Sequence, residues 1–214
     1  LITREEALEW EVKNDPRALD LEVDNVRTYP LGESFVHVVG FTGEISEEQL
    51  KTKEFKGYRQ GDWIGKIGVE AEYERMLRGV DGGEIIEVDS IGRKIRTLRL
   101  KNPIPGQNIY LSIDASLQET LFKLMKDALT SSGSCCGAAV VLDPGSGKIL
   151  ALVSLPSFDP NIFSLSMDEG AISEILSRPS APVLNRAIAG IYPPGSTFKI
   201  VSSLAALSSG KITK

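Results

Sequence analysis

The sequence predicts an α+β protein with two parts: a mixed domain over residues 1–107, and a second domain over residues 108–214 in which helices cover an antiparallel sheet. Three observations predict this arrangement. Residues 1 to about 100 are charged and Gly-rich, with short apolar runs broken by turn residues. A Pro/Gly connector at residues 101–107 follows, and the composition beyond it shifts to apolar and small residues. Two strongly apolar runs in the second part flank a turn sequence, which is typical of a buried hairpin.

Short elements are expected at the start of the first domain. Thr3 and Glu6 have the spacing of a capping box, which predicts a short helix that reaches Trp10. The apolar runs at residues 21–26 and 34–41 predict strands. The second of these runs contains the only histidine of the chain, His37.

An amphipathic helix is predicted over residues 68–79, ending at Gly79. One face of this helix carries its apolar residues, Val69, Tyr73, Met76 and Leu77. The carboxylates of Glu70, Glu72 and Glu74 alternate around the helix, so we interpret them as a solvated face rather than as metal ligands or paired catalytic acids. Two alternating strands, residues 84–88 and 94–98, then flank a Gly-containing turn and predict a hairpin.

The second domain is predicted to begin with a strand over residues 108–113 and a helix from Asp114 or Ser116 to about Leu129. A hairpin follows, with strands at residues 138–142 and 148–153 around a Pro/Gly/Ser turn. Both strands are apolar on each face, which predicts a sheet covered on both sides by helices.

Composition excludes several classes of function. The net charge is −5, and no stripe of Lys and Arg is present, so nucleic acid is not an expected partner. No run approaches the roughly 18 apolar residues that span a bilayer, so we expect a soluble chain whose membrane anchor, if any, lies outside these residues. Cys135 and Cys136 are adjacent, which suits neither a disulfide nor zinc; we interpret them as buried thiols and expect no metal or cofactor.

The candidate catalytic residues are Ser196 and Lys199. A turn-forming Pro193-Pro194-Gly195 precedes Ser196, and a helical pattern follows it, so Ser196 is predicted to open a helix with Lys199 one turn later on the same face. Because a single histidine in a predicted strand makes a Ser-His-Asp triad improbable, lysine is the expected base for a serine nucleophile. Its pKa would have to fall from about 10.4, and burial and the helix dipole both act in that direction.

The bare Ser-x-x-Lys pattern is weak evidence. Residues 208–211 match it equally well, although a helix terminator interrupts that second match. Ser196 as a helix cap, beside a solvated Lys199, is the alternative interpretation. The choice therefore depends on the surrounding residues.

Those residues resemble the class B penicillin-binding proteins. Residues 185–199 are similar to the segment around the active serine of that family, and residues 113–118 and 139–161 are similar to its entry segment, first hairpin and following loop. In the first domain, residues 27–30, 39–43 and 71–79 resemble the pedestal of the elongation-type members, penicillin-binding protein 2. The resemblance implies a dimerisation-type pedestal followed by the N-terminal portion of a transpeptidase domain.

The resemblance implies that Ser196 is the acylated nucleophile and Lys199 its proton acceptor. The expected substrates are peptidoglycan stem peptides ending in D-Ala-D-Ala, and β-lactams would acylate the same serine. A membrane glycosyltransferase of the elongation machinery is the implied partner. The parent protein is expected to be membrane-anchored on the extracytoplasmic, periplasmic side. Asn185 and Arg186 are expected to brace the loop before the serine, and Tyr192 to pack against the Pro-Pro turn.

One departure from the family is large. Its Ser-x-Asn and Lys-Thr-Gly motifs are absent from these residues, so the 214 residues alone are expected to be catalytically inactive. Two alternatives remain open: a non-catalytic interaction module for a cell-wall glycosyltransferase complex, and a β-lactamase or β-lactam sensor, which shares Ser-x-x-Lys.

Overall fold

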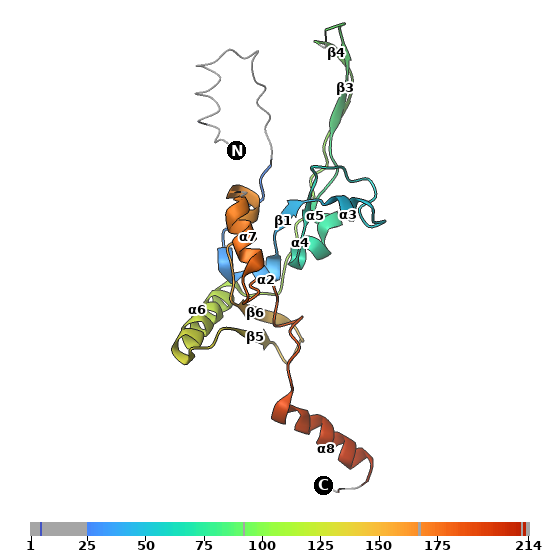
Figure 1. Ribbon diagram of the computed structural model, residues 1–214. Coiled ribbons are helices and arrows are strands. Elements are labelled where there is room, and N and C mark those ends of the chain that lie inside the picture. The colour runs from blue at the N-terminus through green and yellow to red at the C-terminus, as the bar shows by residue number, and fades with distance from the viewer. Residues whose placement is uncertain (1–4, 6–24, 92, 167, 211, 213–214) are drawn as a thin grey trace.

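The computed structural model describes residues 5, 25–91, 93–166, 168–210 and 212, without the side chains of residues 165 and 166. Figure 1 shows an elongated molecule: a two-stranded hairpin projects at one end, a helix projects at the other, and the remaining elements pack between them. The predicted helix at residues 3–10 and most of the predicted strand at 21–26 lie outside the described residues.

The first part contains short elements. They are η1 (Gly32–Ser34), α2 (Val36–Val39), β1 (Thr42–Glu44), α3 (Glu47–Leu50), β2 (Trp63–Gly65), α4 (Gly68–Glu72) and α5 (Glu74–Leu77). β1 pairs with β2 in antiparallel register. Ser46 and Gln49 form the capping box of α3.

The predicted strand at residues 34–41 is wrong, because Ser34 ends η1 and residues 36–39 form α2. Three consecutive side chains, those of Phe35, Val36 and His37, are buried. A strand would turn neighbouring side chains to opposite faces, whereas a helical turn directs all three into the protein. Gly40, with φ of 87°, then ends the helix in a conformation that favours glycine.

The predicted helix at residues 68–79 is confirmed in position but is divided into α4 and α5 at Tyr73, whose φ and ψ are −110° and 21°. The predicted faces are wrong. Glu70 and Glu74 are buried, whereas Tyr73 and Met76 are exposed. Both carboxylates find donors inside the protein, which compensates their removal from water. Glu72 alone is solvated, as predicted for all three.

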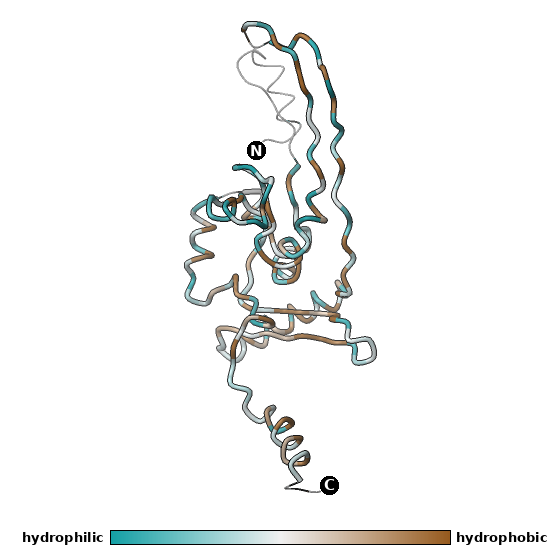
Figure 2. The backbone as a smooth tube through the Cα atoms, turned by 90° about the vertical axis from the view of Figure 1, so that its right-hand side faces the viewer, coloured by the Kyte–Doolittle hydropathy of each residue, from teal (hydrophilic) through white to brown (hydrophobic). Residues whose placement is uncertain are grey.

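The projecting hairpin is confirmed. β3 (Gly83–Val88) pairs with the longer β4 (Lys94–Lys101). Both faces are exposed almost throughout, and hydrophobic and hydrophilic segments alternate along it in Figure 2. Cross-strand ion pairs, Lys94 with Glu84 and Arg96 with Glu87, link the two strands. An isolated hairpin of this kind is marginally stable on its own.

In the second part, α6 (Ala115–Ser132) is confirmed and begins after Asp114, whose carboxylate accepts a hydrogen bond from Leu117 N. β5 (Gly137–Leu142) and β6 (Ile149–Leu155) form the predicted antiparallel hairpin. The predicted strand at 108–113 is wrong: this segment lies beside β6 through two isolated contacts, Ser112 Oγ to Ile149 O and Asp114 N to Leu150 O. Two such contacts do not make a ladder.

The two strands differ in how they are covered. β6 is buried on both faces over residues 151–155, with α6 packed on one side. β5 is half-buried on one face and exposed on the other at Ala138, Val140 and Leu142. The sequence predicts coverage on both sides for the whole sheet. Within the described residues, β6 alone is covered on both sides.

Two hydrophobic clusters stabilise the molecule. The first joins Tyr29, Val36 and Phe41 to Phe158, Phe163 and Ile175. Phe158 lies in the loop after β6, Phe163 in η2 (Ile162–Ser166) and Ile175 in α7 (Glu169–Ser177). The second joins Phe122 of α6 to Val153 and Leu155 of β6. Residues from both sides of the predicted boundary at residue 107 therefore share one cluster.

The prediction that both cysteines are buried is wrong. Cys135 is exposed and Cys136 is partly exposed, because they lie between the end of α6 and the start of β5. Both are free thiols.

Candidate active site

The segment with Ser196 and Lys199 forms the projecting end of the molecule. Gly195, with φ of 54°, turns the chain into a 3-10 helix, η3 (Gly195–Phe198), which runs directly into α8 (Lys199–Ser208). The predicted helix start is thus confirmed, with a tighter first turn. In a 3-10 turn, residues three apart eclipse one another, so Ser196 and Lys199 share a face.

Neither side chain is bonded to the other in the described part of the chain, and both residues are exposed. The helix-cap interpretation of Ser196 does not describe the structure: the N-cap of η3 is Pro194, that of α8 is Phe198, and no side chain caps either. Thr197, not Ser196, bonds the preceding turn, through its hydroxyl to Pro194 O. The catalytic roles of Ser196 and Lys199 remain predictions.

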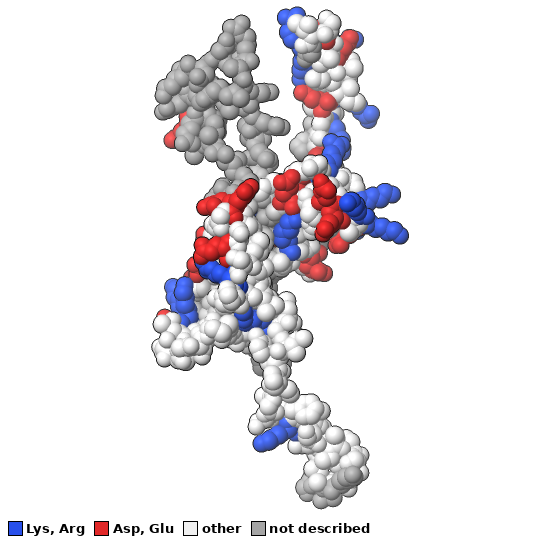
Figure 3. All heavy atoms as spheres, in the orientation of Figure 1, with Lys and Arg blue, Asp and Glu red and all other residues white. Residues whose placement is uncertain are grey.

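The surroundings of Lys199 are apolar. Lys199 is the one charged residue of α8, and in Figure 3 the described atoms of the projecting end are almost all those of uncharged residues. Large apolar side chains are exposed along it: Ile188, Ile191, Tyr192, Phe198, Ile200, Val201 and Leu204.

Asn185 and Arg186 brace the loop before the serine, as predicted. Asn185 Oδ1 accepts from Ala187 N at 3.1 Å, and its Nδ2 donates to His37 O at 2.9 Å. Arg186 is buried and donates from its guanidinium to the carbonyls of Ser180, Ala181 and Leu184. Its backbone N donates to Ser154 Oγ at 3.0 Å, which ties the loop to β6. The expected packing of Tyr192 is not realised as burial, because its side chain is exposed.

His37 contacts the same loop from α2. Its Nε2 lies 2.7 Å from Pro182 O, and because a carbonyl only accepts, Nε2 carries the proton. Burial lowers the pKa of His37, and the positive charge of Arg186 acts in the same direction; the hydrogen bond to Pro182 opposes both. This contact gave no signal in the sequence.

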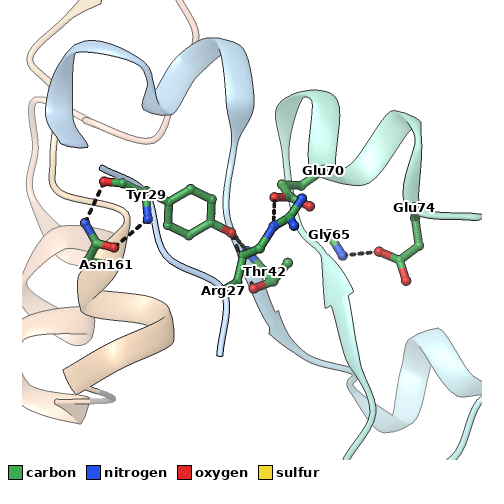
Figure 4. A network of polar contacts seen from close by, with 7 residues as sticks. All are labelled: Arg27, Tyr29, Thr42, Gly65, Glu70, Glu74 and Asn161. Carbon is green, nitrogen blue, oxygen red and sulfur yellow. Dashed lines mark hydrogen bonds and ion pairs between the residues drawn. The ribbon is translucent and has the colours of Figure 1, made fainter. Parts of the chain in front are cut away.

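A polar network joins the two parts of the molecule near α4 (Figure 4). Asn161 pairs with the backbone of Tyr29: Tyr29 N donates to Oδ1 at 2.9 Å, and Nδ2 donates to Tyr29 O at 3.0 Å. The Tyr29 hydroxyl accepts from Thr42 N at 2.8 Å, and burial raises the pKa of this hydroxyl.

The two buried carboxylates extend this network. Arg27 Nε lies 2.5 Å from Glu70 Oε1, and this hydrogen bond raises the pKa of Arg27. Glu74 Oε2 accepts from Gly65 N at 2.8 Å. Both carboxylates therefore fix local structure and do not stand free for catalysis. The described residues contain no group of three or more His, Cys, Asp or Glu side chains placed to hold a metal ion.

The search for a membrane span covers the same described residues. None of their helices is both long and apolar enough to cross a bilayer.

Comparisons with known proteins agree with this architecture. Residues 2–111 match the family model of the penicillin-binding protein dimerisation domain, and residues 137–214 match that of the penicillin-binding protein transpeptidase domain. The peptidoglycan D,D-transpeptidase MrdA of Acinetobacter baumannii is 38% identical over 200 residues, covering 94% of this chain and 29% of the relative. MrdA of Escherichia coli K12 is 40% identical over 192 residues, covering 88% and 29%.

Solved structures give the same result. Pseudomonas aeruginosa PBP2, in complex with WCK 5153, has a TM-score of 0.65 at 38% identity, over 88% of this chain and 36% of that one. Helicobacter pylori PBP2, in complex with MreC, has a TM-score of 0.69 at 30% identity, over 85% and 32%. The chain thus spans 29% of the length of these curated relatives. The dimerisation domain is followed by the start of the transpeptidase domain, and the relatives and solved structures described above are MrdA and PBP2 proteins, so this chain belongs to the penicillin-binding proteins, of the penicillin-binding protein 2 type.

Proposed function

We propose that the protein to which this chain belongs is a peptidoglycan D,D-transpeptidase with Ser196 as its nucleophile. One observation carries the proposal: Ser196 opens a helix directly after a Pro-Pro-Gly turn, with Lys199 one turn later, in a chain 38–40% identical to curated peptidoglycan D,D-transpeptidases.

In the proposed reaction, Ser196 Oγ attacks the carbonyl carbon of the penultimate D-alanine of a stem peptide, and the Lys199 amine accepts the hydroxyl proton. Backbone N–H groups at the helix start stabilise the negative charge on the attacked oxygen. The tetrahedral intermediate then collapses, the terminal D-alanine leaves with a proton, and an acyl-enzyme remains. An amine of a neighbouring strand attacks this ester, forms the cross-link and releases Ser196. A β-lactam follows the first half of this path, with opening of its ring.

The 214 residues alone are expected not to perform this reaction. A lysine accepts the serine proton only as a neutral amine, and burial is what favours that form. Lys199 is exposed in this structure and is not bonded to Ser196 within the described residues. The Ser-x-Asn and Lys-Thr-Gly motifs of the family are also absent from the 214 residues.

Labelling with a fluorescent penicillin, followed by peptide mapping, tests the proposal. We expect a stable adduct on Ser196 of the full-length protein, loss of the adduct in Ser196→Ala, and none on the 214-residue chain. Ser208→Ala is the matched control, since Ser208 belongs to the second Ser-x-x-Lys match, and it should label normally. An adduct elsewhere, or none on the full-length protein, would reject the transpeptidase assignment. Rapid turnover of the β-lactam would instead favour a β-lactamase.

A second role is as an interaction module, which the projecting hairpin favours. The hairpin exposes apolar residues on both faces, including Ile85, Ile95, Leu98 and Leu100. We propose that the protein is membrane-anchored on the extracytoplasmic side and that this hairpin contacts a membrane glycosyltransferase of the elongation machinery. The solved neighbour from H. pylori was itself captured in complex with another protein, MreC.

Co-purification with the glycosyltransferase tests this role in the full-length protein. Ile95→Glu with Leu98→Glu should abolish co-purification, because a charge replaces an exposed apolar contact on the hairpin. Leu124→Glu, a similarly exposed leucine on α6, is the control and should leave it intact. Undiminished capture by the hairpin variant would exclude the hairpin as the contact.

A further inference from the structure

The position of Ser196 depends on a short stretch of the chain. η3 and α8 project away from the body (Figure 1), and all their residues except the partly exposed Ala206 are exposed. We call residues 190–208 the serine segment and the loop 181–189 before it the foot. Within the described residues, the foot is the last part of the chain that is hydrogen-bonded to the body, and at its end Ala189 N donates to Asn185 O at 2.8 Å and Ile188 N to the same oxygen at 3.3 Å. The contacts that hold Asn185 in place therefore also set the position at which the serine segment begins.

Two contacts from α2 fix this foot. His37 Nε2 donates to Pro182 O at 2.7 Å, and Asn185 Nδ2 donates to His37 O at 2.9 Å. His37, in the dimerisation domain, thus donates one hydrogen bond to the loop and accepts one from it. The partners are 145 and 148 residues apart along the chain. We refer to these two hydrogen bonds as the His37 clamp.

The other side of the foot is held by β6. Ser154 Oγ accepts from Arg186 N at 3.0 Å and donates to Leu184 O at 3.1 Å. Ala181, one residue before Pro182, has φ of 42°, which a non-glycine residue adopts only when its surroundings impose it. The Arg186 guanidinium holds the Ala181 carbonyl in that conformation. The loop is therefore held between α2 and β6 in one strained shape.

One hydrogen bond of the clamp, from His37 to Pro182 O, is buried, and the other is part-buried. His37 is 7% exposed, and its ring packs edge-on against Phe158 with centroids 6.2 Å apart. A buried donor that loses its partner is costly, so the loop has few alternative places. The packing of the ring and the hydrogen bond of Nε2 are separable functions, which allows each to be tested alone.

We infer that His37 and Asn185 are positioning residues for Ser196, through which the dimerisation domain sets the orientation of the serine segment. The inference rests on the proposed function and adds to it a dependence of acylation on α2. Neither residue touches the reacting atoms. Their effect should fall on the rate of acylation within the bound complex, because orientation governs that step, and not on the affinity of the complex.

The test uses the full-length protein and the acylation of Ser196 by a fluorescent penicillin, with the acylation rate constant separated from the dissociation constant. His37→Phe keeps the aromatic ring and removes the hydrogen bond; Asn185→Asp keeps the acceptor for Ala187 N and removes the donor to His37 O. Each should lower the acylation rate constant by about tenfold, the scale of one lost hydrogen bond, at unchanged dissociation constant. His37→Gln, whose amide restores a donor to Pro182 O, should recover most of the rate.

Glu74→Gln is the matched control for general loss of stability, since it perturbs a buried carboxylate whose partners are Gly65 N and the Tyr58 hydroxyl rather than either bond of the clamp, and it should acylate at the normal rate. The inference fails if His37→Phe and Asn185→Asp acylate as fast as the unaltered protein, or if Glu74→Gln slows acylation equally. If the unaltered protein is not labelled at Ser196, it is the proposed function that fails.

Discussion

Replacing Gln118 by Met removes a buried amide that joins three elements. Gln118 is fully buried on α6; its Nε2 donates to Ser34 O and to Leu152 O, each at 2.7 Å, and its Oε1 accepts from Leu152 N at 2.8 Å. Methionine has a similar length but supplies neither the donor nor a comparable acceptor. Two buried backbone groups, Leu152 N and Leu152 O, and the part-buried Ser34 O therefore lose their partners.

The expected loss follows from that count. A buried polar group without a partner costs about 1–3 kcal/mol, so the two buried groups at the lower end give about 2 kcal/mol of lost unfolding free energy, to which the part-buried Ser34 O adds. The assay is urea unfolding at 25 °C followed by far-ultraviolet circular dichroism. Lys123→Met, on an exposed position of the same helix, is the control and should change stability by less than about 0.5 kcal/mol. A loss below about 1 kcal/mol for Gln118→Met would refute the reasoning, because it would mean that the three groups find other partners.

Three further predictions concern the buried carboxylate, the histidine and the thiols. Glu70→Gln should lower the free energy of unfolding by about 1 kcal/mol, because Arg27 loses its charged partner but is half-exposed and can turn to water. Glu72→Gln, on the exposed face, should leave the free energy of unfolding unchanged. Thermal melts measure both variants. Burial lowers the pKa of His37, so the unfolded chain binds the proton more readily than the folded one, and the stability should fall as the pH drops below about 6.5. The urea unfolding midpoints at pH 7.5 and 5.5 should therefore differ less in His37→Gln than in the unaltered protein. An equal pH dependence in that variant would contradict this prediction. Maleimide should modify the exposed Cys135 before Cys136, because the hydrogen bond between the Cys136 thiol and Cys135 raises the pKa of Cys136. Mass spectrometry of partially labelled protein shows the order, and the reverse order would contradict the prediction.

Features with a local cause could be predicted from the sequence. The helix after Asp114, the two hairpins with their turns, and the Pro-Pro-Gly turn before Ser196 all have their signals within a few residues. The serine segment was found for the same reason, because its motif is continuous in the chain.

Features that depend on distant partners could not be predicted. The run at residues 34–41 alternates like a strand, but packing against distant residues makes it helical. Glu70 has the sequence environment of a solvated carboxylate, and its partner Arg27 is 43 residues away. The clamp of His37 on Pro182 and Asn185 spans still longer separations, so no window of sequence contains it.

The cluster shared by Tyr29, Val36 and Phe41 with Phe158, Phe163 and Ile175 bears on how the chain folds during synthesis. When residue 107 has been made, the first three side chains still lack the partners that bury them. Completing the cluster requires translation of about 70 further residues, a delay of roughly 3–14 s at about 5–20 residues per second. During that interval three aromatic or aliphatic side chains stay accessible to chaperones and to other nascent chains, so folding of the early segment must wait for the late one.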